Sequence, residues 1–192
     1  FQNIYAYAVN VSEGKDTTVV IKNTTLPGWS SFGSAVESVS FDDCNFVKTV
    51  NGYDSGCTTV ATYTDTTFAD CTFTEDYASE NTAANENGVY VDPSVKTGAV
   101  VEMTGCKVVT ASGADSDKTV ADVLNTEKMG EATTAIVAID ATKNAAGEYI
   151  SGTFVGSTDA INAKLAEGST YNEETGTVTA KAGVSVNGTK YD

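Results

Sequence analysis

Hydrophobic and polar positions follow a six-residue phrase that recurs along the first 155 residues. The phrase reads apolar, two turn-forming residues, a small residue, any residue, apolar. Each copy predicts a strand, a tight bend and a second short strand, with its fourth and sixth positions pointing inward. The four clearer copies are IKNTTL (21–26), FDDCNF (41–46), FADCTF (68–73) and MTGCKV (103–108), and the two weaker ones are FQNIYA (1–6) and YISGTF (149–154).

The third position of the phrase carries Asn, Asp or Gly in five of its six copies. These residue types tolerate the left-handed backbone that a sharp corner between strands requires. We therefore interpret Asp43, Asp65 and Asp70 as bend residues rather than as catalytic carboxylates.

The copies begin at positions 1, 21, 41, 68, 103 and 149, with spacings of 20, 20, 27, 35 and 46 residues. A minimum period of about 20 residues with longer gaps elsewhere is typical of a solenoid whose longer coils bulge out as loops. Stacked coils place equivalent residues about 4.8 Å apart. The prediction is an internal structural ladder made of Phe41, Phe68, Met103, Cys44, Cys71 and Cys106.

Other segments complete the predicted architecture. Residues 27–36 are predicted as a corner loop, and 132–140 as a strand that resumes the core. Val120, Val123 and Leu124 share a helical face, and Gly130 would end that helix. We expect a parallel β-helix over 1–156 and a small C-terminal α/β cap over 157–192. In this cap Ser157 is the N-cap of a short helix, and GTVTA (176–180) and GVSV (183–186) form a β-hairpin.

The bend phrases, with Asn or Asp before Cys, resemble the coils of right-handed parallel β-helix proteins of the pectin-lyase-like type. The resemblance covers about residues 1–155. The stretches YISGTFVG and AINAKLAEGSTYNEETGTVTA are similar to the ends of β-helix regions in large secreted surface proteins of gut bacteria. The resemblance implies an all-β, right-handed parallel β-helix with irregular coils.

Composition limits the classes of partner. Hydrophobic residues make up 41% of the 192 residues and charged residues 19%, which predicts a packed core. The net charge of −15 comes from 11 Lys and 26 acidic residues, and it disfavours nucleic acid and anionic lipid surfaces. No apolar run approaches the roughly 20 residues of a spanning helix, so no membrane insertion is expected. Because the chain begins with Phe1 rather than Met, we expect a processed product.

The four cysteines form no CxxC pair and the chain has no His, which argues against a zinc site. We predict that Cys44, Cys71 and Cys106 are reduced and buried, with disulfides as the alternative because coils stack closely. The loop 140–148 misses the EF-hand spacing of calcium ligands. No cofactor is therefore predicted, and calcium is kept as the alternative.

The family resemblance also implies polysaccharide cleavage, and the residues test this implication. Lyases of this fold use an Arg base beside calcium held by Asp residues, and this chain has no Arg. A carboxylate-only mechanism with a pair of acidic residues from separate coils stays open as an alternative.

Four aromatic residues in or beside predicted loops, Trp29, Tyr53, Tyr63 and Tyr77, are candidates for stacking on a sugar ring or for anchoring loops to the coil. We predict a non-catalytic, secreted or surface-exposed β-helix scaffold that acts in adhesion, glycan contact or assembly of an external structure. Its partners would be a glycan or protein subunits, copies of itself included. The alternatives are a virion decoration or fibre protein on the particle surface, and a polysaccharide-cleaving enzyme.

Overall fold

The computed structural model describes most of the chain. The described residues are 7–11, 16–27, 29–32, 36–47, 59–62, 64–75, 88–92, 96–126, 129, 134–180, 184–186 and 189–191.

The described chain is mostly β-strand with very little helix, which confirms the prediction of an all-β protein. Its helical parts are one short helix, α1 (Thr158–Asn162), and one 3-10 turn, η3 (Val120–Val123).

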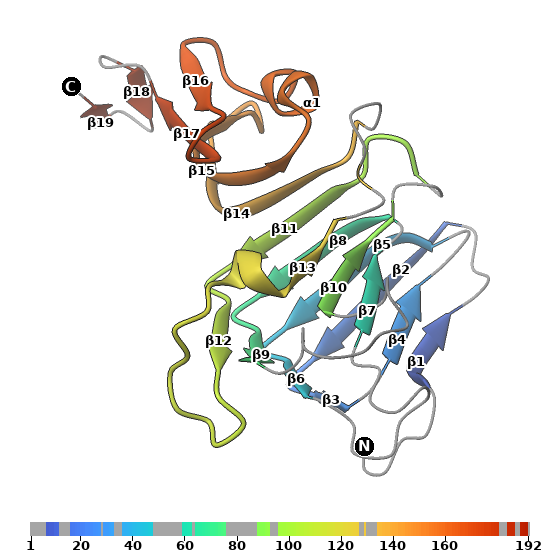
Figure 1. Cartoon of the computed structure of the whole chain (residues 1–192). Coiled ribbons are helices and arrows are strands. Elements are labelled where there is room, and N and C mark those ends of the chain that lie inside the picture. The colour runs from blue at the N-terminus through green and yellow to red at the C-terminus, as the bar shows by residue number, and fades with distance from the viewer. Residues whose placement is uncertain are drawn as a thin grey trace.

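Most strands belong to three sheets (Figure 1). The first sheet contains, in order, β1 (Tyr7–Val11), β4 (Trp29–Phe32), β7 (Thr59–Thr62), β10 (Gly88–Val91) and β13 (Leu124–Asn125). The second begins with β2 (Thr17–Lys22), β5 (Val36–Asp42), β8 (Asp65–Ala69), β11 (Val100–Thr104) and β14 (Ile136–Lys143). The third contains β3 (Thr25–Pro27), β6 (Asn45–Val47), β9 (Thr72–Thr74) and β12 (Lys107–Val109). All neighbours named here pair in parallel.

The chain visits these sheets in a fixed order. From β2 to β13 it passes repeatedly through the second, the third and then the first sheet. We call one such pass a rung, for example β5, β6 and β7. Parallel pairing between rungs requires each pass to cross over before it returns to the same sheet, as the order of the strands shows.

The register of the pairs stacks equivalent side chains from rung to rung. Phe68 lies opposite Phe41 on one side and Met103 on the other. The Phe41 and Phe68 rings are stacked, with centroids 5.0 Å apart. In the third sheet Phe46 and Phe73 stack in the same way at 4.9 Å. The two phenylalanine stacks meet edge to face inside the molecule, which gives the core an aromatic centre.

The parallel pattern ends at β14. The next strand, β15 (Tyr149–Gly156), pairs with β14 in antiparallel orientation. The sequence predicted YISGTF (149–154) as a further parallel copy of the phrase. That prediction is wrong, because these residues belong to an antiparallel strand. The turn between the two strands explains the reversal, because the Asn144 side-chain oxygen accepts hydrogen bonds from the backbone N–H groups of Ala146 and Glu148. The second sheet is consequently mixed, with parallel strands from β2 to β14 and antiparallel strands from β15 on.

The predicted helix between 120 and 130 is wrong. Thr119 and Asp122 form a capping box around η3, but the turn stops at Val123. Leu124 then enters β13 and pairs with Val89 of β10. Pairing of Leu124 with the edge of the first sheet thus overrides the helical spacing of its neighbours. The corner loop predicted over 27–36 is also corrected, because residues 29–32 form β4.

The region after 156 contains the predicted helix but a different hairpin. The Ser157 hydroxyl accepts from the Ala160 N–H, which confirms it as the N-cap of α1. The strand at 177–180, β17 (Thr177–Ala180), pairs with β16 (Ser169–Asn172) and also with β15. β18 (Val184–Val186) instead pairs with β19 (Thr189–Tyr191). The predicted hairpin between GTVTA and GVSV is therefore wrong, since each strand has another partner.

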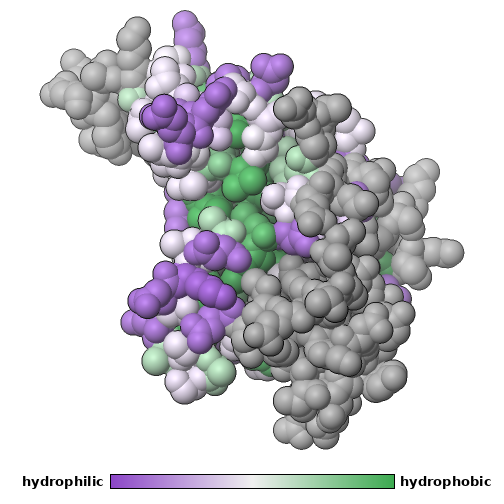
Figure 2. All heavy atoms as spheres, viewed as in Figure 1, coloured by the Kyte–Doolittle hydropathy of each residue, from purple (hydrophilic) through white to green (hydrophobic). Residues whose placement is uncertain are grey.

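Two apolar clusters form the interior. The larger lies between the three sheets, and the smaller holds β15, α1 and β17 against the outward face of β14 through residues such as Ile136, Phe154 and Ile161. Figure 2 shows apolar side chains gathered in a band between the C-terminal strands and the segment around β12. Leu124, Met129 and Val155 are half-buried and pack against the larger cluster.

Replacing Phe68 by Ala should destabilise the fold strongly, because this fully buried ring contacts both phenylalanine stacks. The expected loss is about 3–5 kcal/mol in unfolding free energy, measured by denaturant titration. Val20→Ala is the matched control, since Val20 is 55% exposed, and it should change stability by less than about 0.5 kcal/mol. Equal losses in the two variants would contradict the central place of Phe68 in the core.

Candidate functional site

The bends that join the second sheet to the third form one row of left-handed residues. Asn23, Asp43, Asp70 and Gly105 have φ angles of 51°, 50°, 52° and 63°. The bend role predicted for Asp43 and Asp70 is thereby confirmed. Backbone hydrogen bonds tie successive bends together, from the Asp43 N–H to the Ala69 carbonyl and from the Asp70 N–H to the Thr104 carbonyl. A Cβ at Gly105 would collide with the Asp70 carboxylate, so glycine suits this member of the row.

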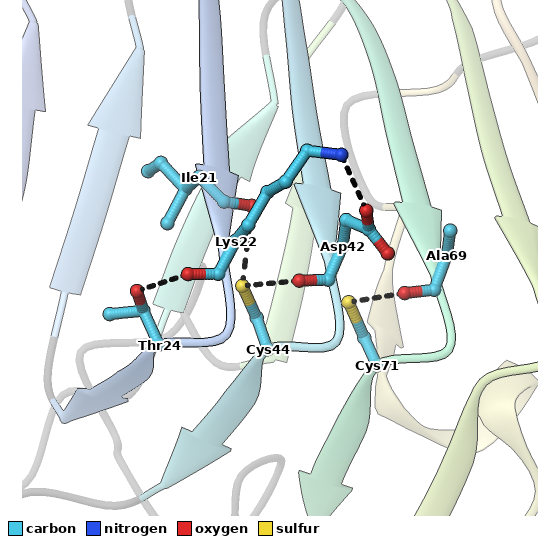
Figure 3. A network of polar contacts seen from close by, with 7 residues as sticks. All are labelled: Ile21, Lys22, Thr24, Asp42, Cys44, Ala69 and Cys71. Carbon is cyan, nitrogen blue, oxygen red and sulfur yellow. Dashed lines mark hydrogen bonds and ion pairs between the residues drawn. The ribbon is translucent and has the colours of Figure 1, made fainter.

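The residue after each bend donates a hydrogen bond to the carbonyl two positions earlier. Thr24 donates its hydroxyl to the Lys22 carbonyl at 2.8 Å, and Cys44 donates its thiol to the Asp42 carbonyl at 3.5 Å (Figure 3). Cys71 and Cys106 repeat the contact with the carbonyls of Ala69 and Thr104. The repeated cysteine therefore adds a side-chain donor to a carbonyl that already accepts a backbone N–H from the neighbouring rung.

The structure brings the predicted ladder residues together. Cys44, Cys71 and Cys106 follow equivalent bends on successive rungs, and all three are free. Cys44 and Cys71 are fully buried, whereas Cys106 is only partly buried. The expectation that all three are buried is thus corrected for Cys106, because it leads into β12, which lies at the edge of the third sheet and has no further described strand beside it.

The three thiols have different proton affinities. Burial raises the pKa of Cys44. The hydrogen bond between the other two sulfurs raises the pKa of Cys71, and burial adds to the effect. The same hydrogen bond lowers the pKa of Cys106 against the effect of burial. Cys106 is therefore the thiol of this row that loses its proton first.

A second polar cluster joins β11, β14 and β15. The Tyr149 hydroxyl donates to Glu102 Oε1 at 2.6 Å, and Lys143 forms an ion pair with the same oxygen. The Lys143 ammonium also lies 4.7 Å from the centre of the Tyr149 ring. Burial acts to raise the pKa of Glu102, but the hydrogen bonds from Lys143 and Tyr149 outweigh it and lower the pKa. Burial, followed by the contact with Glu102, raises the pKa of Tyr149.

This cluster holds the antiparallel part of the chain against the parallel part. Tyr149 is only 2% exposed, so its hydroxyl is enclosed by the protein. With the carboxylate charged and the phenol protonated, all three side chains satisfy one another. The arrangement favours a structural latch over acid–base chemistry on a large substrate.

Two further carboxylates, Asp65 and Asp42, are engaged by neighbouring groups. The sequence predicted Asp65 as a bend residue. That prediction is wrong, because Asp65 begins β8. Its two oxygens accept from the Lys96 ammonium at 2.6 Å and from the Val100 N–H at 2.8 Å. Asp42 forms an ion pair with Lys22 at 2.7 Å between neighbouring strands (Figure 3). Such partly exposed pairs contribute roughly 0–1 kcal/mol each.

The four aromatic residues predicted as binding residues have no described side chains, so that prediction stays open. Trp29 begins β4, and only its backbone is described. Tyr53, Tyr63 and Tyr77 lie outside the described residues, as does Cys57. Among the described residues, no group of three or more His, Cys, Asp or Glu side chains is placed to hold a metal ion.

Sequence reasoning missed two features of these sites. The latch of Glu102, Lys143 and Tyr149 has no local signal, because its members are distant in sequence and meet only through strand pairing. The donor role of the fourth phrase position did have a signal. Thr24, Cys44, Cys71 and Cys106 all carry an OH or SH group, although the pattern was interpreted only as a small residue.

Comparisons of the chain with protein-family models, with curated proteins and with solved structures find no match. Within the described part of the chain, no helix has the length and apolar character needed to cross a membrane.

Asp43→Val should destabilise the protein by about 1–2 kcal/mol, because a β-branched side chain is unfavourable at positive φ. Asp43→Asn and Asp43→Gly should both stay within about 0.5 kcal/mol of the parent. Denaturant titration of the three variants makes the comparison. A loss in Asp43→Asn as large as that in Asp43→Val would show that the carboxylate charge, rather than the backbone angle, matters at this position.

The latch predicts a pH-dependent contribution to stability. Since the folded-state pKa of Glu102 lies below its ordinary value of 4.5, its contribution is present above that pH and is lost as the pH falls through the folded-state pKa. The difference in unfolding free energy between the parent and Glu102→Gln should therefore be largest at neutral pH and shrink below about pH 4.5. Glu174→Gln in an exposed turn is the control. A difference that is constant from pH 7 to pH 3 would argue against the latch.

Proposed function

We propose that this chain is a non-catalytic scaffold of a secreted or surface-exposed structure, built as a right-handed parallel β-helix up to β14. The antiparallel β15 then closes this part, and residues 157–192 form the C-terminal cap. The observation that carries the proposal is the unbroken register from rung to rung, with Ile21, Phe41, Phe68, Met103 and Ile139 in one line of paired residues. A repeated bend, a stacked interior and parallel pairing are the components of a solenoid.

The chemistry of the bends supports a structural role. The thiols that recur along the chain hydrogen-bond to the chain's own carbonyls, and the Asp70 carboxylate faces the backbone of Gly105. The ion pairs of Asp42 and Asp65 link separate segments of the same chain. These groups stabilise stacking, and a stiff stack with a dry interior suits a protein exposed to proteases and mechanical stress.

The edges of the sheets support assembly with other protein subunits. β1, β2 and β3 each lie at the end of their sheet, and together they belong to the same end of the stack. Among the described strands, none pairs with their outer edges. An edge strand offers backbone donors and acceptors to a strand from another chain. The scaffold would thus assemble with copies of itself or with other subunits through this end.

Native mass measurement across a range of protein concentrations tests the assembly. We expect an oligomer, and we expect Thr18→Lys on β2 to shift it toward the monomer, because a lysine on an edge strand opposes strand addition. Ser40→Lys on β5, an inner strand of the same sheet, is the matched control and should keep the oligomer. A monomer at every concentration would contradict the assembly.

A separate experiment tests whether the protein lacks polysaccharide-cleaving activity. Incubation with acidic and neutral polysaccharides should release neither reducing ends nor unsaturated products. Release that is lost when Asp42 or Asp65 is replaced by Asn would instead assign the chain to the polysaccharide-cleaving class.

A further inference from the structure

Two of the three described thiols, Cys71 and Cys106, form a pair at the more exposed end of the cysteine row. Cys71 and Cys106 follow the bends of adjacent rungs, and both are free. Backbone hydrogen bonds flank the pair, from the Asp70 N–H to the Thr104 carbonyl at 2.9 Å and from the Lys107 N–H to the Cys71 carbonyl at 3.0 Å. Paired strands lie about 4.8 Å apart, within the roughly 4.4–6.8 Å between Cα atoms that a disulfide spans.

The Cys106 sulfur reaches toward the rung that carries Cys71. Cys71 Sγ donates to the Ala69 carbonyl at 3.3 Å, and Cys106 Sγ reaches across the rungs to the Phe68 carbonyl at 3.5 Å. These carbonyls are consecutive at the end of β8. Strand pairing on both sides of the bends holds the two cysteines on adjacent rungs.

Access to the pair is one-sided. Cys71 is fully buried, whereas Cys106 is partly exposed and stands at the end of the thiol row in the described residues. A reagent from solvent therefore meets the Cys106 sulfur before it meets the Cys71 sulfur. The lowered pKa of Cys106 supports the same order, since the thiolate is the nucleophile in thiol–disulfide exchange.

We propose that Cys106 and Cys71 are a redox-reactive pair that exchanges with small-molecule disulfides to form a reversible cross-link between two rungs. In the first step the Cys106 thiolate attacks one sulfur of the reagent, RSSR, forms a mixed disulfide and releases RS⁻, which takes up a proton. In the second step Cys71 loses its proton and attacks the Cys106 sulfur, which releases the second RSH. In total, two protein thiols and RSSR give one protein disulfide and two RSH.

The cross-link is readily reversible because of the stacking. Side chains on neighbouring parallel rungs point the same way, so their Cβ atoms tend to stay about 4.8 Å apart, whereas a relaxed disulfide brings them to about 3.5–4.5 Å. Closing this gap strains the bond, and strained disulfides are the more easily reduced ones. The pair is thus suited to respond to the oxidant around it rather than to act as a permanent link.

Mass spectrometry of the folded protein treated with 2-hydroxyethyl disulfide tests the proposal. This neutral reagent is chosen because the net charge of −15 would repel an anionic one. All proteins carry Cys57→Ser, so that only the three described thiols can react. We expect the loss of two hydrogens, a cross-linked peptide pair containing Cys71 and Cys106, and full reversal by a reductant.

Single variants resolve the order of the steps. Cys71→Ser should stop at the mixed disulfide and keep one mercaptoethanol adduct on Cys106. Cys106→Ser should gain no adduct while folded, because Cys71 is buried. Cys44→Ser is the matched control and should cross-link like the parent. Serine suits all three positions, since the Thr24 hydroxyl makes the equivalent contact with a bend carbonyl.

Three results would overturn the proposal. One is a parent protein that stops at a mixed disulfide without closing the link. Another is an adduct that forms on Cys44 or Cys71 before Cys106. The third is a folded protein whose thiols all stay unreacted until denaturant is added.

Discussion

The fold depends on a tight bend at which one residue adopts a left-handed backbone and the next residue donates a side-chain hydrogen bond to the carbonyl just before the bend. Asn23, Asp43, Asp70 and Gly105 supply the backbone angle, and Thr24, Cys44, Cys71 and Cys106 supply the donor. The residue at positive φ avoids the strain that a bulky side chain would bring there. The cysteine donors add a second hydrogen bond to carbonyls that also accept a backbone N–H from the neighbouring rung. Repetition of the bend residue and the donor keeps successive strands in register.

The interior follows from that register. Because equivalent bends lie beside one another on successive rungs, the strands that flank them pair in the same register. Phe41 therefore lies opposite Phe68, and Phe46 lies opposite Phe73. The aromatic rings can then stack along the rungs and meet edge to face across the sheets. Bend chemistry at the surface and aromatic packing inside are thus two results of one repeated phrase. The latch of Glu102, Lys143 and Tyr149 adds the C-terminal strands to this framework.

Sequence reasoning predicted the parts that local chemistry determines. The period of the phrase, the left-handed bends at Asp43 and Asp70 and the Ser157 cap all have residue-level causes within a few positions. It failed where distant pairing decides the outcome. Leu124 has the spacing of a helical residue, but it lies in β13 and pairs with Val89. YISGTF matches the sequence pattern, but it follows a reversing turn that the Asn144 side chain stabilises. Asp65 was misplaced because its partners, Lys96 and Val100, lie in another rung.

The chain reversal at Asn144 gives the molecule a direction. In the second sheet the outer edge of β2 has no neighbour among the described strands, whereas the far side of β14 is already occupied by the antiparallel β15. A chain that extends the parallel part of this sheet can add only beside β2. A larger structure that extends this sheet would therefore grow in one direction only. Further strands would add beside β2, whereas the end at β14 and β15 would stop growth.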